Sequence, residues 1–266
     1  MTDLTLHRPG AILSYDVTGP GVLRPILVAA HGLTSSRANE DASGIFDWSP
    51  VIASGRTVAR FDARGHGAST GRAQPEDWHW PELAADLLAV VDAVSPDQPV
   101  DGLGVSMGAG TLLWAAVLHP ERFRRLVLVI PPTAWGTRAA QAALYEQSAA
   151  FIEERGMEAW IRAMVALPQH PILEAGGWPR GPDADAAEDL LPTVFRGAAG
   201  TDVPGEDEVA ALKHEVLLLP WAEDPGHPVS TAERLAELLP NARLEVATTP
   251  DDIRRWGARI AAFLEH

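Results

Sequence analysis

The sequence contains no cysteine, which excludes disulfide bonds and thiolate metal sites. Basic residues are also few, with 21 lysines and arginines against 36 acidic residues and a formal net charge of -15. No basic cluster is available to neutralise phosphates, so we expect no nucleic-acid partner. No apolar run approaches the roughly 18 residues that a membrane-spanning helix needs, and MTDLTLHRPG lacks the basic and apolar segments of a leader. These absences together predict a soluble cytoplasmic protein without a membrane partner.

What the sequence does contain is enough apolar material for a large core, since 46% of its 266 residues are hydrophobic. Short apolar runs alternate with helical patterns, which is typical of an α/β protein with a mostly parallel sheet. An antiparallel hairpin is expected at the front of the chain, from residues 3–7 and 11–17. The other expected strands are residues 26–30, 57–62, 100–105, 125–130, 215–220 and 243–247.

The alternation of strands and helices is interrupted over residues 133–212, which carry helical patterns and turn signals but no convincing strand. An insertion of this length is too large for a loop. It predicts a helical cap inserted into a core formed by residues 1–132 and 213–266. Within the insertion, the acidic stretch DADAAEDL at residues 183–190 is expected to be the solvated face of a helix. After it, the spacing of Ser230 and Glu233 predicts a capping box at the start of a helix.

The strongest chemical signal is GVSMG at residues 104–108, between an apolar run and a helical pattern. In a strand-turn-helix context, small residues at Gly104 and Gly108 permit a sharp turn that exposes the Ser106 hydroxyl. The helix that follows directs its first amides toward whatever Ser106 attacks. Ser106 is therefore a candidate nucleophile.

Two further turns follow predicted strands. HGLTSS at residues 31–36 is expected to present the amide of Leu33 to a developing oxyanion, with the amide of Met107 as its partner. His31 would then shape this turn instead of reacting. DARGHGAS at residues 62–69 is interpreted as a second structural turn, held by hydrogen bonds of its polar side chains.

The order of these motifs resembles the α/β-hydrolase superfamily across most of the chain: HG, then DxRGHGxS, then GxSxG, then HPER at residues 119–122. The resemblance implies an eight-stranded, mostly parallel sheet with helices on both faces and a cap inserted after the sixth strand. It also implies a Ser-acid-His triad at the carboxyl edge of the sheet. The acid of that triad follows the seventh strand, where EVLLLPWAEDPGHP places Asp224.

The sequence departs from the family at the histidine, which is expected on a loop after the last strand. Here that region reads ARLEVATTPDDIRRWGARIAAFLEH, and its loop is short and free of histidine. His227 shares a loop with Asp224, about 10 Å from the serine turn if the two are two strands apart. The remaining histidines are expected to point away (His7, His119, His214), to build turns (His31, His66), to lie too far off (His266) or to overhang the site (His79, His170).

Three readings of the site stay open at this point. His227 is the working base, or the serine binds a ligand in a protein that has lost its hydrolytic machinery, or His79 or His170 serves as the base. The second reading makes the protein a cyclase, a lyase or a ligand-binding protein. Without a base, a serine hydroxyl is a poor nucleophile at neutral pH.

The favoured prediction is a serine-dependent hydrolase of a small, largely apolar ester, lactone or ketone. Ser106 attacks, the amides of Leu33 and Met107 stabilise the oxyanion, Asp224 orients the base and His227 transfers the proton. No metal or organic cofactor is implied, the partner is a small-molecule substrate, and the oligomeric state is left open. Tryptophans in and near the predicted cap suit an apolar pocket: Trp135, Trp160, Trp178 and Trp221.

Overall fold

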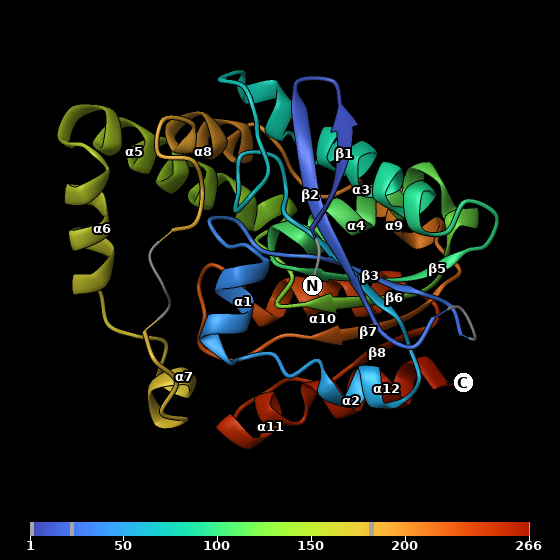
Figure 1. The fold of residues 1–266 in the computed structure, drawn as a ribbon. Helices are drawn as coiled ribbons and strands as arrows, with labels where there is room; N and C mark the ends of the chain where they lie inside the picture. Colours follow the sequence, from blue (N-terminus) through green and yellow to red (C-terminus); the bar gives the residue numbers. More distant parts are fainter. Residues whose placement is uncertain (1–2, 22–23, 181–183, 266) are drawn as a thin grey trace.

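The fold is built on one eight-stranded sheet with the strand order β1-β2-β4-β3-β5-β6-β7-β8 (Figure 1). The computed structural model describes residues 3–21, 24–180 and 184–265. β1 and β2 form the predicted antiparallel hairpin, β2 also runs antiparallel to β4, and all other neighbours are parallel. The strands are β1 Leu4–Arg8, β2 Ala11–Thr18, β3 Leu27–Ala30, β4 Val58–Phe61, β5 Val100–Val105, β6 Phe123–Val129, β7 Glu215–Leu219 and β8 Ala242–Leu244. The sheet confirms the predicted α/β-hydrolase fold.

Helices cover both faces of the sheet, because the central strands bury side chains on both sides. In β3, Leu27 belongs to the apolar cluster on one face and Val28 to the cluster on the other. Figure 1 shows α3 and α4 on one side of the sheet and α2 and α12 on the opposite side. The core helices are α1 Arg37–Ser43, α2 Ser49–Ala53, η1 Pro75–Trp78, α3 Trp80–Val94, α4 Met107–Leu118, η2 Pro120–Arg122, α10 Val229–Leu238, α11 Pro250–Arg254 and α12 Trp256–Glu265.

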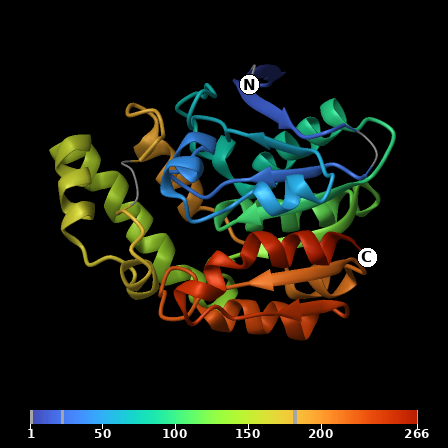
Figure 2. The same ribbon diagram turned by 60° about the horizontal axis from the view of Figure 1, so that its bottom comes forward.

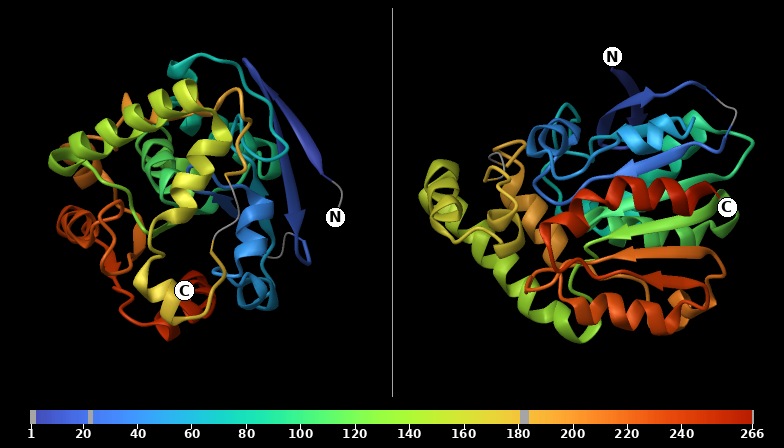
Figure 3. Two further views of the ribbon diagram at one scale, coloured as in Figure 1. Left: turned by 90° about the vertical axis from the view of Figure 1, so that its left-hand side faces the viewer. Right: turned by 90° about the horizontal axis from the view of Figure 1, so that it is seen from below.

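Only helices and connecting segments lie between β6 and β7 in the described part of the chain. They are η3 Trp135–Thr137, α5 Arg138–Arg155, α6 Met157–Ala166, α7 Pro171–Ala175, α8 Leu191–Ala199 and α9 Glu206–Ala211. α5 packs on α8, and α8 packs on η1, whereas α9 contacts α4 and α10. Figures 2 and 3 show α5 and α6 extending beyond the edge at which the parallel strands end.

Three local predictions were wrong. The described part of the acidic stretch, residues 184–190, is extended backbone and turn because the Asp185 amide donates to Thr34 O and the Asp185 carbonyl accepts from the Gly67 amide. Asp183 lies outside the described residues. Ser230 is not an N-cap, since α10 begins at Val229 after Pro228, whose side chain makes no capping bond. β8 ends at Leu244, short of the predicted strand.

No helix within residues 3–21, 24–180 and 184–265 combines the length and the apolar character needed to cross a membrane.

Candidate active site

Ser106 lies in the turn between β5 and α4, with φ 52° and ψ -112°. A residue other than glycine in this region costs about 1 to 3 kcal/mol, and such strain is stored mainly where the structure around it holds the residue in place. The Ser106 amide donates to Val129 O at 3.0 Å. A Cβ atom on Gly104 would lie 2.2 Å from Gly108 O, and one on Gly108 would lie 2.2 Å from Ala30 O. Both flanking positions must therefore be glycine for the turn to pack this closely.

The Ser106 hydroxyl meets His227, the histidine of the loop after β7. Ser106 Oγ lies 2.6 Å from His227 Nε2, and His227 Nδ1 lies 2.8 Å from Asp224 Oδ2. The strand order puts β6 between β5 and β7, so the loop crosses the two-strand interval expected from the sequence. The structure thus brings together Ser106, His227 and Asp224.

Asp224 is held as a carboxylate by three donors. Trp221 Nε1 donates to Asp224 Oδ2 at 2.7 Å, the Gly226 amide donates to Asp224 Oδ1 at 2.8 Å, and the third donor is His227 Nδ1. Burial disfavours the charged form, but these hydrogen bonds and the nearby imidazole hold the pKa of Asp224 well below its usual range. Because the carboxylate accepts from Nδ1, the neutral His227 ring carries its proton there, and Nε2 is left to accept from the Ser106 hydroxyl.

The turn after β3 lies against the serine turn. A Cβ atom on Gly32 would lie 3.5 Å from Ser106 Cβ, so the backbone of the HG pair passes directly beside the nucleophile. The amide of Thr34 donates to His66 Nε2 and the amide of Ser35 donates to Gly32 O. Met107 is the first residue of α4, and the amides in the first turn of a helix have no acceptor within the helix. The Leu33 and Met107 segments therefore both lie next to Ser106.

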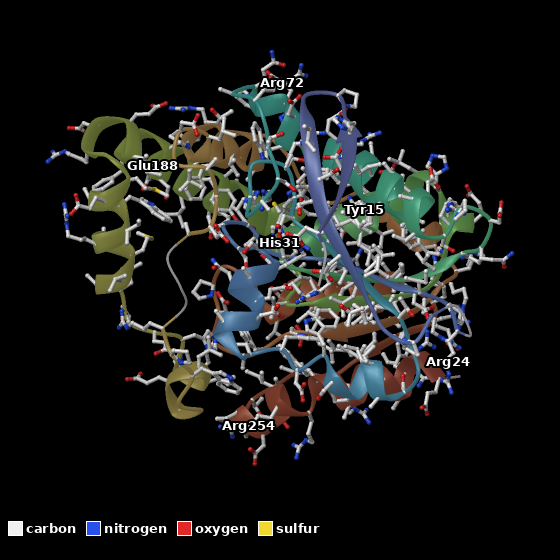
Figure 4. The ribbon with its side chains drawn as sticks, in the orientation of Figure 1. Tyr15, Arg24, His31, Arg72, Glu188 and Arg254 are labelled. Atoms are coloured by element: carbon white, nitrogen blue, oxygen red, sulfur yellow. The ribbon has the colours of Figure 1, made fainter. Side chains whose placement is uncertain are left out.

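His31 and His66 build these turns and do not contact the serine through any hydrogen bond of the described residues. His31 Nε2 accepts from the Ala63 amide at 2.9 Å, and His66 Nδ1 donates to Arg64 O at 2.9 Å. Burial lowers the pKa of both rings, and that of His66 falls to about 3. Figure 4 shows His31 in the interior of the molecule, close to the start of α1. Both histidines are neutral and structural, as their motifs predicted.

The polar side chains around His66 in DARGHGAS are also structural. Asp62 accepts from the Arg37 guanidinium at 3.0 Å and from the Ala68 amide at 3.1 Å. Arg64 makes two hydrogen bonds of 2.8 Å to the buried carboxylate of Asp86. These buried pairs fix the two turns that support the serine turn.

Among the described residues, no other histidine forms a hydrogen bond with Ser106 Oγ. His7 is in the edge strand β1, His119 contacts Glu121, and His214 contacts Pro120 O. His79 precedes α3 beside Gly200. His170 stacks on Trp221, with ring centroids 4.7 Å apart. His266 lies outside the described residues.

The tryptophans of the predicted cap make hydrogen bonds or ring contacts within the protein. Trp135 Nε1 donates to Pro204 O, and Trp160 packs on Phe195. Trp178 Nε1 donates to Gly44 O. The sequence reasoning missed the bond between Trp221 and Asp224, although a donor three residues before a loop carboxylate was a signal that pointed to it.

Comparisons with known proteins concern the family and the fold. A family model described as alpha/beta hydrolase fold matches residues 25–151. An sn-1-specific diacylglycerol lipase of Xenopus laevis is 34% identical over 131 residues, which are 48% of this chain and 39% of the lipase. A 3-oxoadipate enol-lactonase of Acinetobacter baylyi is 26% identical over 71% of this chain and 69% of its own length. The chain thus spans well under half of the lipase and about two thirds of the lactonase.

Solved structures match over nearly the whole chain. A hydrolase from Pseudomonas aeruginosa superposes with a TM-score of 0.81 and 23% identity, covering 99% of this chain and 98% of that one. The enol-lactonase from Burkholderia xenovorans superposes with a TM-score of 0.72 and 20% identity, covering 96% of this chain and 94% of that one. At these identities the likeness establishes the fold.

Proposed function

We propose that this chain, which has the α/β-hydrolase fold, is a serine hydrolase whose triad is Ser106, His227 and Asp224. The observation that carries the proposal is the distance of 2.6 Å between Ser106 Oγ and His227 Nε2. A general base within hydrogen-bonding reach of a serine hydroxyl is the requirement for an activated nucleophile.

The reaction on an ester follows from this geometry. Ser106 Oγ attacks the carbonyl carbon while His227 Nε2 accepts the hydroxyl proton, and Asp224 stabilises the imidazolium that forms. The amides of Leu33 and Met107 donate to the oxyanion of the tetrahedral intermediate. The intermediate collapses to an acyl-enzyme as His227 gives the proton to the departing alcohol. Water, deprotonated by the same histidine, then attacks the acyl carbon and releases the acid with Ser106 restored.

The proposed substrate is a small, largely apolar ester, lactone or ketone, bound under a cap formed by residues 133–212. The named activities of the relatives support small carbonyl substrates, among them an enol-lactonase and the 2-hydroxymuconate semialdehyde hydrolase of Pseudomonas putida. Exposed apolar side chains of the cap helices and the segment after them support apolar contact: Leu144, Phe151, Met164, Val165 and Leu167.

The experiment that tests the proposal is covalent labelling with a fluorophosphonate, read by intact mass, on the wild type, Ser106→Ala and His227→Ala. We expect one adduct on the wild type and none on either variant, with circular dichroism showing that both remain folded. Hydrolysis of p-nitrophenyl acetate, butyrate and octanoate then ranks the acyl chains.

Other outcomes assign other functions. Labelling that persists in His227→Ala would remove His227 as the base and direct attention to His79 and His170. A wild type that is neither labelled nor active on esters would favour a non-hydrolytic member of the superfamily, such as a cyclase, a lyase or a ligand-binding protein.

A further inference from the structure

Trp221 contacts the proposed triad through its indole N–H. Trp221 Nε1 lies 2.7 Å from Asp224 Oδ2, the same oxygen that accepts from His227 Nδ1. The ring of Trp221 also meets that of His227 edge-on, with centroids 6.4 Å apart. Trp221 is 8% exposed, so this hydrogen bond belongs to a buried residue.

Two aromatic rings hold the indole in its plane. His170, at the start of α7, stacks on it at 4.7 Å with planes 29° apart, and Trp256, at the start of α12, stacks on it at 6.1 Å with planes 26° apart. Trp221 and Ala247 form an isolated bridge, so the backbone here is also paired with the segment after β8. The resemblance places the family's histidine on that segment, but the sequence has none there. The segment leads instead to α12, the helix that carries Trp256.

Asp224 and His227 are three positions apart, so the carboxylate and the imidazole that it orients lie on the same short loop. A second fixed donor on Oδ2 restricts rotation of the carboxylate, and the Gly226 amide does the same on Oδ1. Gly226 is itself tied to the core, because its carbonyl accepts from the Thr133 amide at 3.3 Å. Trp221 therefore restrains the carboxylate through a side-chain donor, whereas Gly226 restrains it through a backbone amide.

We propose that Trp221 is a positioning residue, which fixes the Asp224 carboxylate through its N–H and thereby the imidazole of His227 toward Ser106. This inference rests on the proposed function. A hydrogen bond to a charged group contributes more than one between neutral groups, and it acts here on a group whose orientation the reaction needs.

The test separates the N–H from the ring. Trp221→Phe keeps an aromatic ring between His170 and Trp256 but removes the donor. Incorporation of β-(3-benzothienyl)alanine at position 221 keeps the bicyclic shape and replaces the N–H by sulfur, which covers the case in which phenylalanine disturbs folding. Trp114→Phe is the matched control, because Trp114 Nε1 also donates at 2.7 Å, to Asp202 O.

We expect kcat for ester hydrolysis and the rate of fluorophosphonate labelling to fall about 10-fold in both position-221 variants. KM should stay within about two-fold of the wild-type value and Trp114→Phe should match the wild type, since the lost bond orients the base and binds no substrate. The downfield proton resonance of His227 Nδ1–H should shift in both position-221 variants and keep its place in the control. Rates within two-fold of the wild type, together with an unmoved resonance, would reduce Trp221 to a packing residue. A wild type that neither reacts with the fluorophosphonate nor hydrolyses esters would overturn only the proposed function. The shift of the His227 Nδ1–H resonance would still show whether Trp221 positions the imidazole.

Discussion

Asp224 Oδ2 lies 2.8 Å from His227 Nδ1, although the two residues are only three positions apart on the loop after β7. The acid and the base therefore begin and end one short turn, residues 224–227, which is closed by a bond of 3.2 Å from the His227 amide to Asp224 O. Pro225 lies within this turn and Pro228 directly follows it. Local chain geometry fixes their relation, and only the relation of His227 to Ser106 depends on the sheet.

Ser106 and His227 are expected to act as one unit. Ser106→Ala and His227→Ala should each lower kcat by about 10⁴-fold or more, and the double variant should be no slower than either single one. Steady-state kinetics on a p-nitrophenyl ester measures all three. Additive losses would mean that the two side chains contribute through separate steps.

Asp224→Asn should lower kcat by about 10⁴-fold while the protein stays folded. An amide offers one acceptor oxygen where the carboxylate now meets three donors, so its NH2 group must face Trp221, His227 or Gly226. The imidazole then loses its fixed tautomer. Single-turnover hydrolysis measures the loss, and activity within ten-fold of the wild type would show that another group orients His227.

Gly108→Ala should reduce the free energy of unfolding by about 1 to 3 kcal/mol, toward the upper end of that range. Its new methyl group would lie 2.2 Å from a backbone carbonyl, Ala30 O, which cannot turn away as a side chain does. Gly136→Ala is the control, because nothing lies within 4 Å of a Cβ atom there, and its effect should stay within about 0.5 kcal/mol. Urea denaturation of both variants checks the difference, and equal midpoints would contradict it.

Stability should fall as the pH drops below about 6.5. The pKa of His66 is lowered by burial to about 3, so the folded state keeps the ring neutral while the unfolded chain takes up a proton below its ordinary pKa. The stabilisation is complete above about pH 6.5 and is lost progressively toward pH 3, with about 2 kcal/mol lost by pH 5 from this residue. His31 acts in the same direction.

His66→Gln removes one of these titrations. Its free energy of unfolding should be lower than that of the wild type at pH 8 and should change less between pH 8 and pH 5. Urea denaturation across this range measures both slopes. Parallel curves for the two proteins would show that His66 does not account for the loss.

Much of the fold was predictable from the sequence because its signals are local. Apolar runs such as VDGLGV and EVLLL are strands at β5 and β7, with bounds close to those expected. The acidic stretch before α8 was misjudged because its backbone partners, Thr34 and Gly67, are more than a hundred residues away. Composition alone describes a solvated surface and carries no information on such distant partners.

For the site, the sequence by itself determined the serine turn, because Gly104 and Gly108 are the residues that a close strand-to-helix turn requires. It also determined that Asp224 and His227 share a loop and that the usual histidine position is empty. Only the tertiary structure shows that His227, among the histidines of the described residues, lies at Ser106, because a hydrogen bond of 2.6 Å depends on the order of β5, β6 and β7. It alone brought His170 and Trp256 onto Trp221, since side chains distant in sequence meet only when the helices that carry them pack on the finished sheet.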